Sequence, residues 1–307
     1  MMRIITLFTI LIVLLGCKKN VHQVRFKVMA WNILHGANDI PNGIAHAIDI
    51  IEAINPDVIL MVETYGSGKK IADALGYNFH LIAPEGTALN DKHVNLSIMS
   101  KFPFGRRIDT DFPFYLGGRE VVIDHQTIRF FSNWFHYLPW NDTPETMGKT
   151  TEELLVWERT SGTRYEMIQK VLPELEAYAA ETDSIPMVLG GDMNSPSHLD
   201  WSENTASVHN NLVVPWYATK ILEDIGLTDS YRLLHPNPTT HPGITWDTKG
   251  KRDEHRIDYI YFKGPKIKAL KSESYKAFLG DTLSIKNQGI PFPSDHGIVV
   301  TSFELTK

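Results

Sequence analysis

Residues 186–196 read PMVLGGDMNSP, a short apolar run that ends in a glycine pair and two closely spaced polar residues. The run predicts a buried strand over Met187–Leu189. Asp192 and Asn194 then stand just past the strand, where a rigid scaffold presents functional groups to a loop-lined cleft. Because Asp and Asn also bond their own backbone in turns, the stretch alone leaves open a purely structural turn.

The chain on either side of this strand mixes the two-residue period of strands with the helical period. We expect strands at Val24–Asn32, Val58–Val62, Asn78–Ile82, Asn95–Ser100, Glu120–Ile123, Thr127–Ser132, Ile257–Phe262 and Gly297–Phe303. We expect helices at Asn42–Ile54, Lys69–Leu75, Thr163–Ala180 and Trp216–Ile225. Asp124-His125 is typical of a hairpin turn, and Pro139–Gly162 is polar and reads as irregular. Without a repeat or a linker rich in Pro, Gly or Ser, residues 24–307 are interpreted as one α/β domain.

Composition excludes several classes of protein. Hydrophobic residues make up 43% and charged residues 21%, which is ordinary globular usage and not that of a disordered or fibrous chain. The 30 Lys+Arg against 36 Asp+Glu give a net charge of −6, which argues against a protein that grips nucleic acid by bulk charge. This balance does not exclude an enzyme that approaches phosphates through a metal ion. A single cysteine rules out a disulfide framework and any multi-cysteine zinc site.

The first residues have the pattern of a targeting segment and not of a part of the folded domain. Residues 4–15 are apolar except for two threonines, a stretch too short for a comfortable membrane span but suited to a signal-peptide core. The run ends at Leu14-Leu15-Gly16-Cys17, which resembles the lipobox of bacterial lipoproteins, in which the cysteine is lipidated. We therefore expect a signal peptide over residues 1–16, lipidation at Cys17 and a tether over 17–23. The expected location is the bacterial cell envelope, periplasmic or surface-exposed. A signal peptide with a chance cysteine is the alternative.

Polar residues recur at the ends of the expected strands: Asn32, Glu63, His136, Asp192, Asn194, Asp258, Asp295 and His296. Each has a plain structural explanation when it is taken singly, such as a solvated strand end, a turn or a core histidine. Four carboxylates brought together would repel one another unless a cation neutralised them. Because the donors are oxygens, a hard divalent ion such as Mg²⁺ suits them, with Mn²⁺ or Ca²⁺ as alternatives.

Seven short motifs together resemble the endonuclease/exonuclease/phosphatase superfamily over residues 24–304. They are Met29–Asn32, Met61–Thr64, Leu96–Pro103, Gly190–Pro196, Thr245-Trp246, Arg256–Ile260 and Ser294–Gly297. The resemblance implies a four-layer α-β-β-α sandwich, in which two mixed sheets pack face to face between outer helices. It also implies a metal-dependent phosphoesterase that hydrolyses phosphodiesters or phosphomonoesters by in-line attack of water.

The resemblance implies a role for each site residue. Glu63 is the main metal ligand, with Asn32 and Asp295 close to the ion. Asp192 orients or deprotonates the attacking water, and Asn194 holds the phosphate. Asp258 pairs with His296 and favours its charged form, which donates to a phosphate oxygen, and His136 makes a second such donation.

Two departures from the family pattern concern Leu34 and His136. Some nucleases of the family carry an acid at the position of Leu34, two residues after the first asparagine. The family often reads Asn-x-His, whereas Asn133-Trp134-Phe135-His136 has two residues between the asparagine and the histidine.

The sequence leaves the ester open among nucleic acid, nucleotide, phospholipid and sugar phosphate. Trp134, Phe135, Tyr137 and Trp140 crowd the region of His136, and Trp216-Tyr217 lies in a second insertion. These aromatic residues are compatible with core packing or with a wall for a base, sugar or lipid. We expect a monomer, and keep a non-catalytic surface binding protein on the same fold as the alternative function.

Overall fold

Two six-stranded β-sheets lie face to face in the middle of the computed structural model, which describes residues 23–140, 148–246 and 255–306. The first sheet has, in spatial order, β11 (Ile267–Tyr275), β14 (Ile298–Thr306), β1 (Gln23–Asn32), β2 (Val58–Val62), β4 (Ser97–Ser100) and β3 (Asn78–Leu81). The second has β5 (Phe104–Ile108), β6 (Leu116–Ile123), β7 (Gln126–Trp134), β8 (Met187–Asp192), β10 (Asp258–Lys263) and β9 (Thr228–Asp229). Each sheet contains both parallel and antiparallel pairs. The predicted pair of mixed sheets is confirmed.

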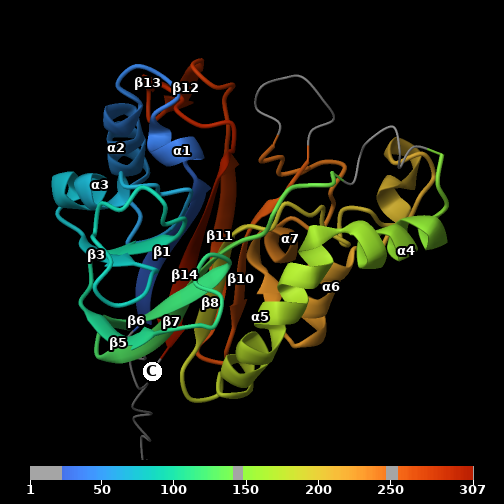
Figure 1. Ribbon diagram of the computed structural model, residues 1–307, viewed down its shortest axis with the longest axis horizontal. Coiled ribbons are helices and arrows are strands. Elements are labelled where there is room, and N and C mark those ends of the chain that lie inside the picture. Colours follow the sequence, from blue (N-terminus) through green and yellow to red (C-terminus); the bar gives the residue numbers. More distant parts are fainter. Residues whose placement is uncertain (1–22, 141–147, 247–254, 307) are drawn as a thin grey trace, which may run out of the picture.

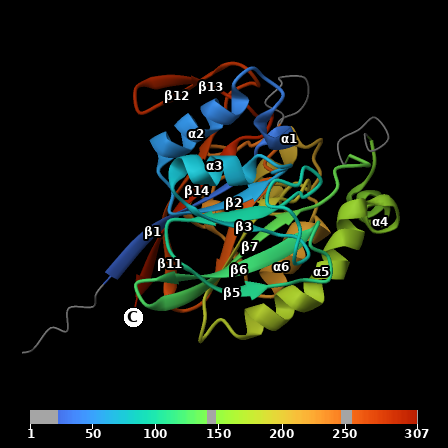
Figure 2. The ribbon, with the colours of Figure 1, turned by 60° about the vertical axis from the view of Figure 1, so that its left-hand side comes forward.

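Helices cover the outer face of each sheet (Figure 1). On the first sheet lie α2 (Gly43–Ile54) and α3 (Gly68–Leu75), with the hairpin of β12 (Thr282–Ile285) and β13 (Gln288–Pro291) beside α2 (Figure 2). On the second sheet lie α5 (Thr163–Ala180) and α6 (Tyr217–Asp224), followed by α4 (Thr151–Ser161) at the periphery. Shorter elements are α1 (Leu34–Ala37), α7 (Ser230–Leu234) and a 3₁₀ turn over Glu203–Val208. The order helix, sheet, sheet, helix is that of a four-layer sandwich.

Alternation along the strands divides the core into layers. In β1, Phe26, Val28 and Ala30 belong to the central layer between the sheets. Met29 and Trp31 of the same strand pack on the other side, against α2 and α3. On the second sheet, Phe131 and Leu189 contact α5 and α6. The period of two in the first half of β1 therefore follows from a strand with one face in the central layer and Arg25 and Lys27 on the other, whereas residues 29–31 are buried on both faces and read as a continuous apolar run.

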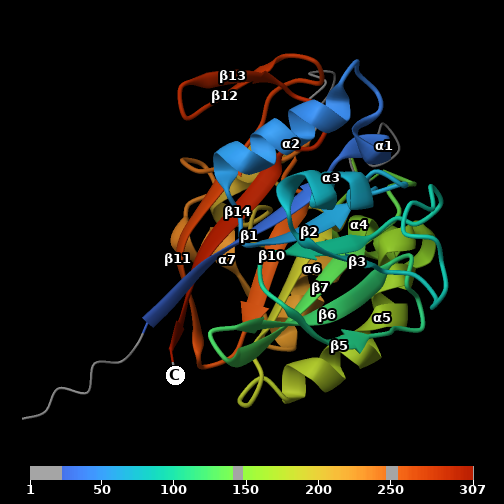
Figure 3. The same ribbon diagram turned by 90° about the vertical axis from the view of Figure 1, so that its left-hand side faces the viewer.

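The N-terminal strand and the C-terminal strand lie side by side in the first sheet (Figure 3). β1 and β14 pair antiparallel from Gln23↔Thr306 to Ala30↔Val299. This register carries the loop before β14 to the carboxyl end of β1. Residues far apart in sequence consequently meet at one end of the sandwich.

The predicted hairpin at Asp124-His125 is confirmed. β6 and β7 pair antiparallel up to Ile123↔Gln126, and the two turn residues have φ of 46° and 64°. Positive φ at both central positions is typical of the tight turns whose twist matches that of the strands.

The prediction that residues 139–162 are irregular is wrong over α4. Thr150 Oγ1 accepts a hydrogen bond from Glu153 N (3.2 Å) and Glu153 Oε2 accepts one from Thr150 N (2.7 Å), a capping box that starts the helix. Only Leu154 and Glu158 of α4 are buried, so the helix carries little apolar periodicity to reveal it. The strands β5, β11, β12 and β13 also escaped prediction. Much of their surface is exposed, so their polar residues mask the alternation.

Candidate active site

Strand register brings the predicted residues to one end of the sandwich. β1 and β2 are parallel, with Asn32 beside Val62, so Glu63 follows at the same edge. In the second sheet, Asp192 at the end of β8 pairs with Asp258 at the start of β10. The carboxyl ends of β1, β2 and β8 thus face the loop that precedes β14, which carries Asp295 and His296.

The Asn32 side chain connects the two sheets. Its Nδ2 donates to Glu63 Oε1 (3.0 Å) and to Asp192 Oδ2 (3.1 Å), while its Oδ1 accepts from Leu34 N (3.0 Å). The amide is fully buried. Because its oxygen faces Leu34, this geometry presents N–H groups to the two carboxylates. It favours a bridging role for Asn32 over direct metal ligation.

Asn194 holds Asp192 on the other side. Its backbone N donates to Asp192 Oδ1 (2.8 Å), and its Nδ2 donates to Asp192 Oδ2 (2.8 Å) and to Phe135 O (2.8 Å). Both amide hydrogens are therefore already used within the protein. The arrangement fits a residue that orients Asp192 better than one that holds phosphate.

A left-handed turn follows Asn32 and reaches the carboxylate of Glu63. Leu34, His35, Gly36 and Ala37 have φ of 50°, 47°, 67° and 59°. His35 N donates to Glu63 Oε2 (3.0 Å), and Glu63 itself has φ of 54°. Non-glycine residues in this region are uncommon and cluster at functional sites. Both oxygens of Glu63 are thus oriented by hydrogen bonds.

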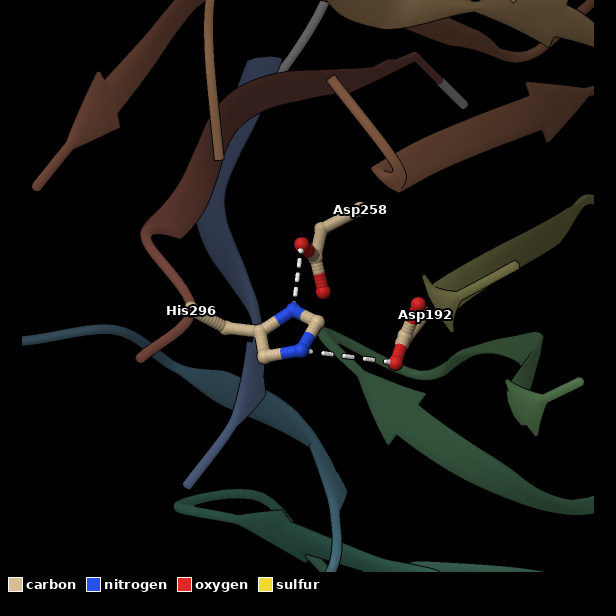
Figure 4. Close-up of side chains that lie close together, drawn as sticks. All are labelled: Asp192, Asp258 and His296. Atoms are coloured by element: carbon tan, nitrogen blue, oxygen red, sulfur yellow. Dashed lines mark hydrogen bonds and ion pairs between the residues drawn. The ribbon is translucent and has the colours of Figure 1, made fainter. Parts of the chain in front are cut away.

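His296 lies between two carboxylates (Figure 4). Its Nδ1 is 3.0 Å from Asp258 Oδ2 and its Nε2 is 3.8 Å from Asp192 Oδ2. All three residues are buried. Burial lowers the pKa of His296, but the charges of Asp258 and Asp192 outweigh it and raise the pKa overall. Burial raises the pKa of Asp192, and the charge on His296 opposes that rise.

This Asp–His–Asp cluster has ligand atoms within 4.8 Å of one another and so has the size of a metal site. Nδ1 of His296, however, lies 3.0 Å from Asp258 Oδ2, and a ring nitrogen that donates to a carboxylate cannot also ligate a metal. An ion-paired histidine is the better interpretation. Oxygen donors suited to Mg²⁺ lie instead around Asn32, where Glu63 and Asp192 accept from the same amide.

Asp295 is buried and belongs to a segment tied to β1. Ser294 Oγ donates to Asn32 O (2.7 Å) and accepts from His296 N (2.9 Å). Trp31 Nε1 donates to His296 O (3.2 Å). Asp295 also contributes to the raised pKa of His296. It therefore lies close to the same corner as Asn32 and His296, as a residue near the metal requires.

The hydrogen bonds of the His136 ring stay within its own loop. Leu138 N donates to Nδ1 (3.1 Å), which leaves the hydrogen of the neutral ring on Nε2. The residue follows Phe135, whose N donates to Asp192 O (3.0 Å). His136 is half-buried at the border of the site, two residues past the Trp134↔Asp192 pair. A role as second phosphate donor stays a prediction.

Three supporting residues escaped the assignment from sequence. Asn95 Oδ1 accepts from Glu63 N (3.1 Å), and Thr245 Oγ1 accepts from Asp258 N (3.1 Å). Ser294 is the third, through its contacts with Asn32 and His296. Thr245 and Ser294 stand in motifs quoted above, so the signal was present but their roles depend on tertiary contacts.

The predicted lipidation site, Cys17, lies outside the described residues. Within residues 23–140, 148–246 and 255–306, no helix is long and apolar enough to cross a membrane.

Several proteins are similar to this chain. A protein of Caenorhabditis elegans, "Uncharacterized protein F14F9.5", is 26% identical over 303 residues, covering 90% of each chain. A truncated C. elegans TDP2 structure covers 91% of this chain and 97% of its own, with 17% identity and a TM-score of 0.57. The human nocturnin catalytic domain with bound sulfate covers 94% and 97%, with 16% identity and a TM-score of 0.56. At these identities, the solved structures show the fold.

Family membership follows from the match of the sequence pattern itself. The pattern of the "Endonuclease/Exonuclease/phosphatase family" matches residues 29–296, which include every predicted site residue except Cys17. The chain belongs to the endonuclease/exonuclease/phosphatase family.

Proposed function

We propose that this protein is a divalent-metal-dependent phosphoesterase in which Asp192 activates the attacking water. The observation that carries the proposal is the geometry of Asp192. Its oxygens accept from Asn32 and Asn194 and face His296 at 3.8 Å, so the carboxylate is held in one orientation at the sheet junction. A fixed carboxylate beside a charged histidine suits in-line attack, which depends mainly on positioning and charge neutralisation.

Glu63 would hold the cation together with Asp295, and Asn32 would orient Glu63. When bound, a divalent ion neutralises charge on phosphate oxygens and orients the ester. Asn194 fixes Asp192, and His296 donates from Nε2 toward a phosphate oxygen. Asp258 keeps the ring of His296 oriented through Nδ1, at 3.0 Å.

The substrate class we propose is a phosphodiester. One structural neighbour is zebrafish TDP2 "complexed with single strand DNA product", with 15% identity and a TM-score of 0.57. That title supports a nucleic-acid-type ester but describes the neighbour. The net charge of −6 makes tight binding of a long polyanion by bulk charge unfavourable, so short or nucleotide-sized esters fit best.

We further propose that the mature protein is anchored to a bacterial membrane through Cys17. The support is the motif Leu14-Leu15-Gly16-Cys17 directly after an apolar run. The tether over 17–23 is short, so the catalytic body would lie close to the membrane surface.

Hydrolysis of bis(4-nitrophenyl) phosphate with and without a chelator tests the proposed activity. We expect hydrolysis with Mg²⁺ or Mn²⁺, its loss in chelator and its recovery on adding the metal back. Asp109→Asn, at a carboxylate whose side chain is 73% exposed, is the matched control for Asp192→Asn and should keep full activity. Full activity in chelator would contradict the metal. Absence of hydrolysis across a panel of phosphate esters would favour the non-catalytic binding protein.

A further inference from the structure

Aromatic rings border the candidate active site on both sheets. From the first sheet come His35, which follows β1, and Tyr65, which follows β2. Their ring centroids are 6.5 Å apart. From the second sheet come His136 and Tyr137, which follow β7 and whose rings stack at 4.8 Å with an interplanar angle of 13°. We call these four residues the rim.

His35 is held rigidly while its ring stays exposed. Its backbone N donates to Glu63 Oε2 (3.0 Å), and its Nδ1 lies 3.0 Å from Asp39 Oδ1 and 3.2 Å from Oδ2. Because a carboxylate only accepts, Nδ1 carries a hydrogen and the ring is oriented. The side chain is nevertheless 62% exposed. An exposed ring next to a candidate metal ligand is available to a bound ester.

Tyr137 is the counterpart on the second sheet. It is 50% exposed, although one face of its ring is covered by His136. Its carbonyl accepts from Arg164 Nη1 (2.9 Å), and this arginine is buried within α5. Two residues earlier, Phe135 O accepts from Asn194 Nδ2 (2.8 Å). The backbone of Tyr137 is therefore held two residues past Phe135, which contacts Asn194 and Asp192.

Tyr65 lies beside His35 on the first sheet and interacts electrostatically with Tyr137 on the second. Burial raises its pKa to about 12, and the charges of Glu63 and Tyr137 add to the rise. The ring of Tyr65, whose centroid lies 6.5 Å from that of His35, is therefore within electrostatic range of both Glu63 and Tyr137. Of the aromatic residues that the sequence suggested as a wall, Tyr137 is exposed in the rim, whereas Trp134, Phe135, Trp140 and Trp216 are buried in the core.

We propose that His35 and Tyr137 determine specificity by binding a planar aromatic ring in the ester group of the substrate. The proposal rests on the proposed phosphodiesterase function. Rings that are already oriented lose little conformational freedom when a flat group stacks on them. The polar edges of the two imidazoles and two phenols favour a heterocycle over an alkyl chain, because an alkyl chain would leave those edges without partners.

Three esters with one leaving group test the recognition of the ring. They are the 4-nitrophenyl phosphate esters of thymidine (at O5′), methanol and octanol, compared by kcat/KM. We expect the wild type to prefer the thymidine ester. His35→Asn removes the ring but keeps a residue that tolerates left-handed backbone, and Tyr137→Ala removes the second ring. Each should lower the thymidine-to-methyl ratio roughly 5- to 100-fold, the range for loss of one base-stacking contact.

Matched variants separate the ring from the fold. Tyr137→Phe keeps the ring and should keep the ratio of the wild type. Phe278→Ala removes a ring that is 44% exposed outside the rim and should leave the ratio unchanged. A ratio that neither His35→Asn nor Tyr137→Ala moves would overturn the proposal. So would a preference for the octyl ester that the same two variants abolish.

A binding experiment tests recognition of the base by the rim separately from hydrolysis of the ester. Titration with thymidine 5′-monophosphate and with deoxyribose 5-phosphate, both in Mg²⁺, compares ligands that differ by the base alone. Tighter binding of the nucleotide that is lost in Tyr137→Ala supports the rim even if no ester is hydrolysed, which would refute only the proposed catalysis. Equal affinity of the wild type for both ligands would overturn the rim.

Discussion

Asn32 contacts a carboxylate from each sheet, and this double contact explains why a buried amide is kept at the sheet junction. Its donors reach Glu63 of the first sheet and Asp192 of the second, at 3.0 and 3.1 Å. Burying polar groups is costly unless they are hydrogen-bonded, and here both amide hydrogens and the oxygen have partners. The distance between the candidate metal ligand and the candidate base is thereby set by one side chain.

Asp192→Asn tests the candidate base. The substitution keeps size and shape but removes the carboxylate that accepts or orients a water proton. A general base is typically worth about 10²–10⁴ in rate, so kcat should fall by roughly that factor while substrate affinity changes little. Single-turnover kinetics with saturating Mg²⁺ measures the chemical step. A variant with nearly wild-type kcat, where chemistry is rate-limiting, would falsify the assigned base.

Glu63→Gln tests the candidate metal ligand. The amide keeps an acceptor for His35 N but loses the negative charge that attracts a cation. We expect the Mg²⁺ concentration for half-maximal activity to rise at least about tenfold, with partial recovery of kcat at high Mg²⁺. Metal titration of activity checks this. An unchanged metal requirement would remove Glu63 from the ligand set.

At the scale of elements, α4 and α6 are joined by a buried glutamate. Glu158 of α4 accepts from Tyr217 N at 3.0 Å through each of its oxygens, at the N-terminus of α6. Burial raises the pKa of Glu158 to about 7, although the Tyr217 hydrogen bond and the Arg164 charge oppose the rise. The carboxyl group therefore binds its proton more tightly in the folded chain than in the unfolded chain.

The pH dependence of stability follows from this shift. Between the unfolded pKa of about 4.5 and the folded pKa of about 7, the native state holds more protons, so stability falls as pH rises through this window. Glu158→Gln removes the effect, worth up to about 3 kcal/mol. In urea unfolding between pH 5 and pH 7.5, the free energy of unfolding of Glu158→Gln should rise relative to that of the wild type as the pH rises. Glu166→Gln, with a side chain 66% exposed, is the control. Parallel pH curves for Glu158→Gln and wild type would contradict the assignment.

A buried ion network supports the start of β10, two residues before Asp258. Arg256 donates to Asp229 Oδ2 (2.6 Å) and to Asp200 Oδ2 (2.8 Å), and Arg232 lies 2.7 Å from Asp200. Asp229 also accepts from Tyr231 N at the start of α7 (2.9 Å). The network joins β9, β10 and α7 and thereby holds the strand that carries Asp258.

Arg256→Met should destabilise the protein by about 3–5 kcal/mol, because the buried carboxylates of Asp200 and Asp229 would then have Arg232 as the remaining cation of the network. Urea unfolding at neutral pH measures the loss. Arg25→Met makes the same change at a side chain that is 72% exposed and should cost under about 1 kcal/mol. Equal stability of the two variants would show that the network contributes little.

At the scale of the whole molecule, the site is a junction of two sheets and depends on their packing. The central apolar layer holds β1 and β2 against β7, β8 and β10. Gly191 has φ of 149°, and a Cβ there would lie 2.0 Å from Asn133 O. The chain can therefore bring Asp192 to the junction only with glycine at this position.

Cys17→Ser tests the anchoring of the whole molecule. Expressed in a bacterial host, the wild type should partition into the detergent phase with a lipid-modified terminus. The variant lacks the thiol that carries the lipid, so it should be found as a soluble or unprocessed form. Cell fractionation and mass spectrometry of the terminus check this. A wild type released with an unmodified terminus would contradict the lipoprotein interpretation.

Local patterns in the sequence determined single strands, helices and the polar strand ends, while the pair of sheets was expected from the resemblance to the family. Alternation in β1, the apolar run of β2 and the glycine pair before Asp192 all reflect burial of single strands, which neighbouring residues encode. The helix α4 was missed although its capping box, Thr150 to Glu153, is local, because its apolar periodicity is weak.

Only the tertiary structure decided what each polar residue contacts. The amide of Asn32 bridges Glu63 and Asp192, and the hydrogens of Asn194 are committed to Asp192 and Phe135. His35 follows β1 of the first sheet and Tyr137 follows β7 of the second, and only the packing of the two sheets brings these residues to the same site. Such contacts depend on how two sheets pack across an apolar layer, and packing of residues distant in sequence leaves no periodic pattern in the chain.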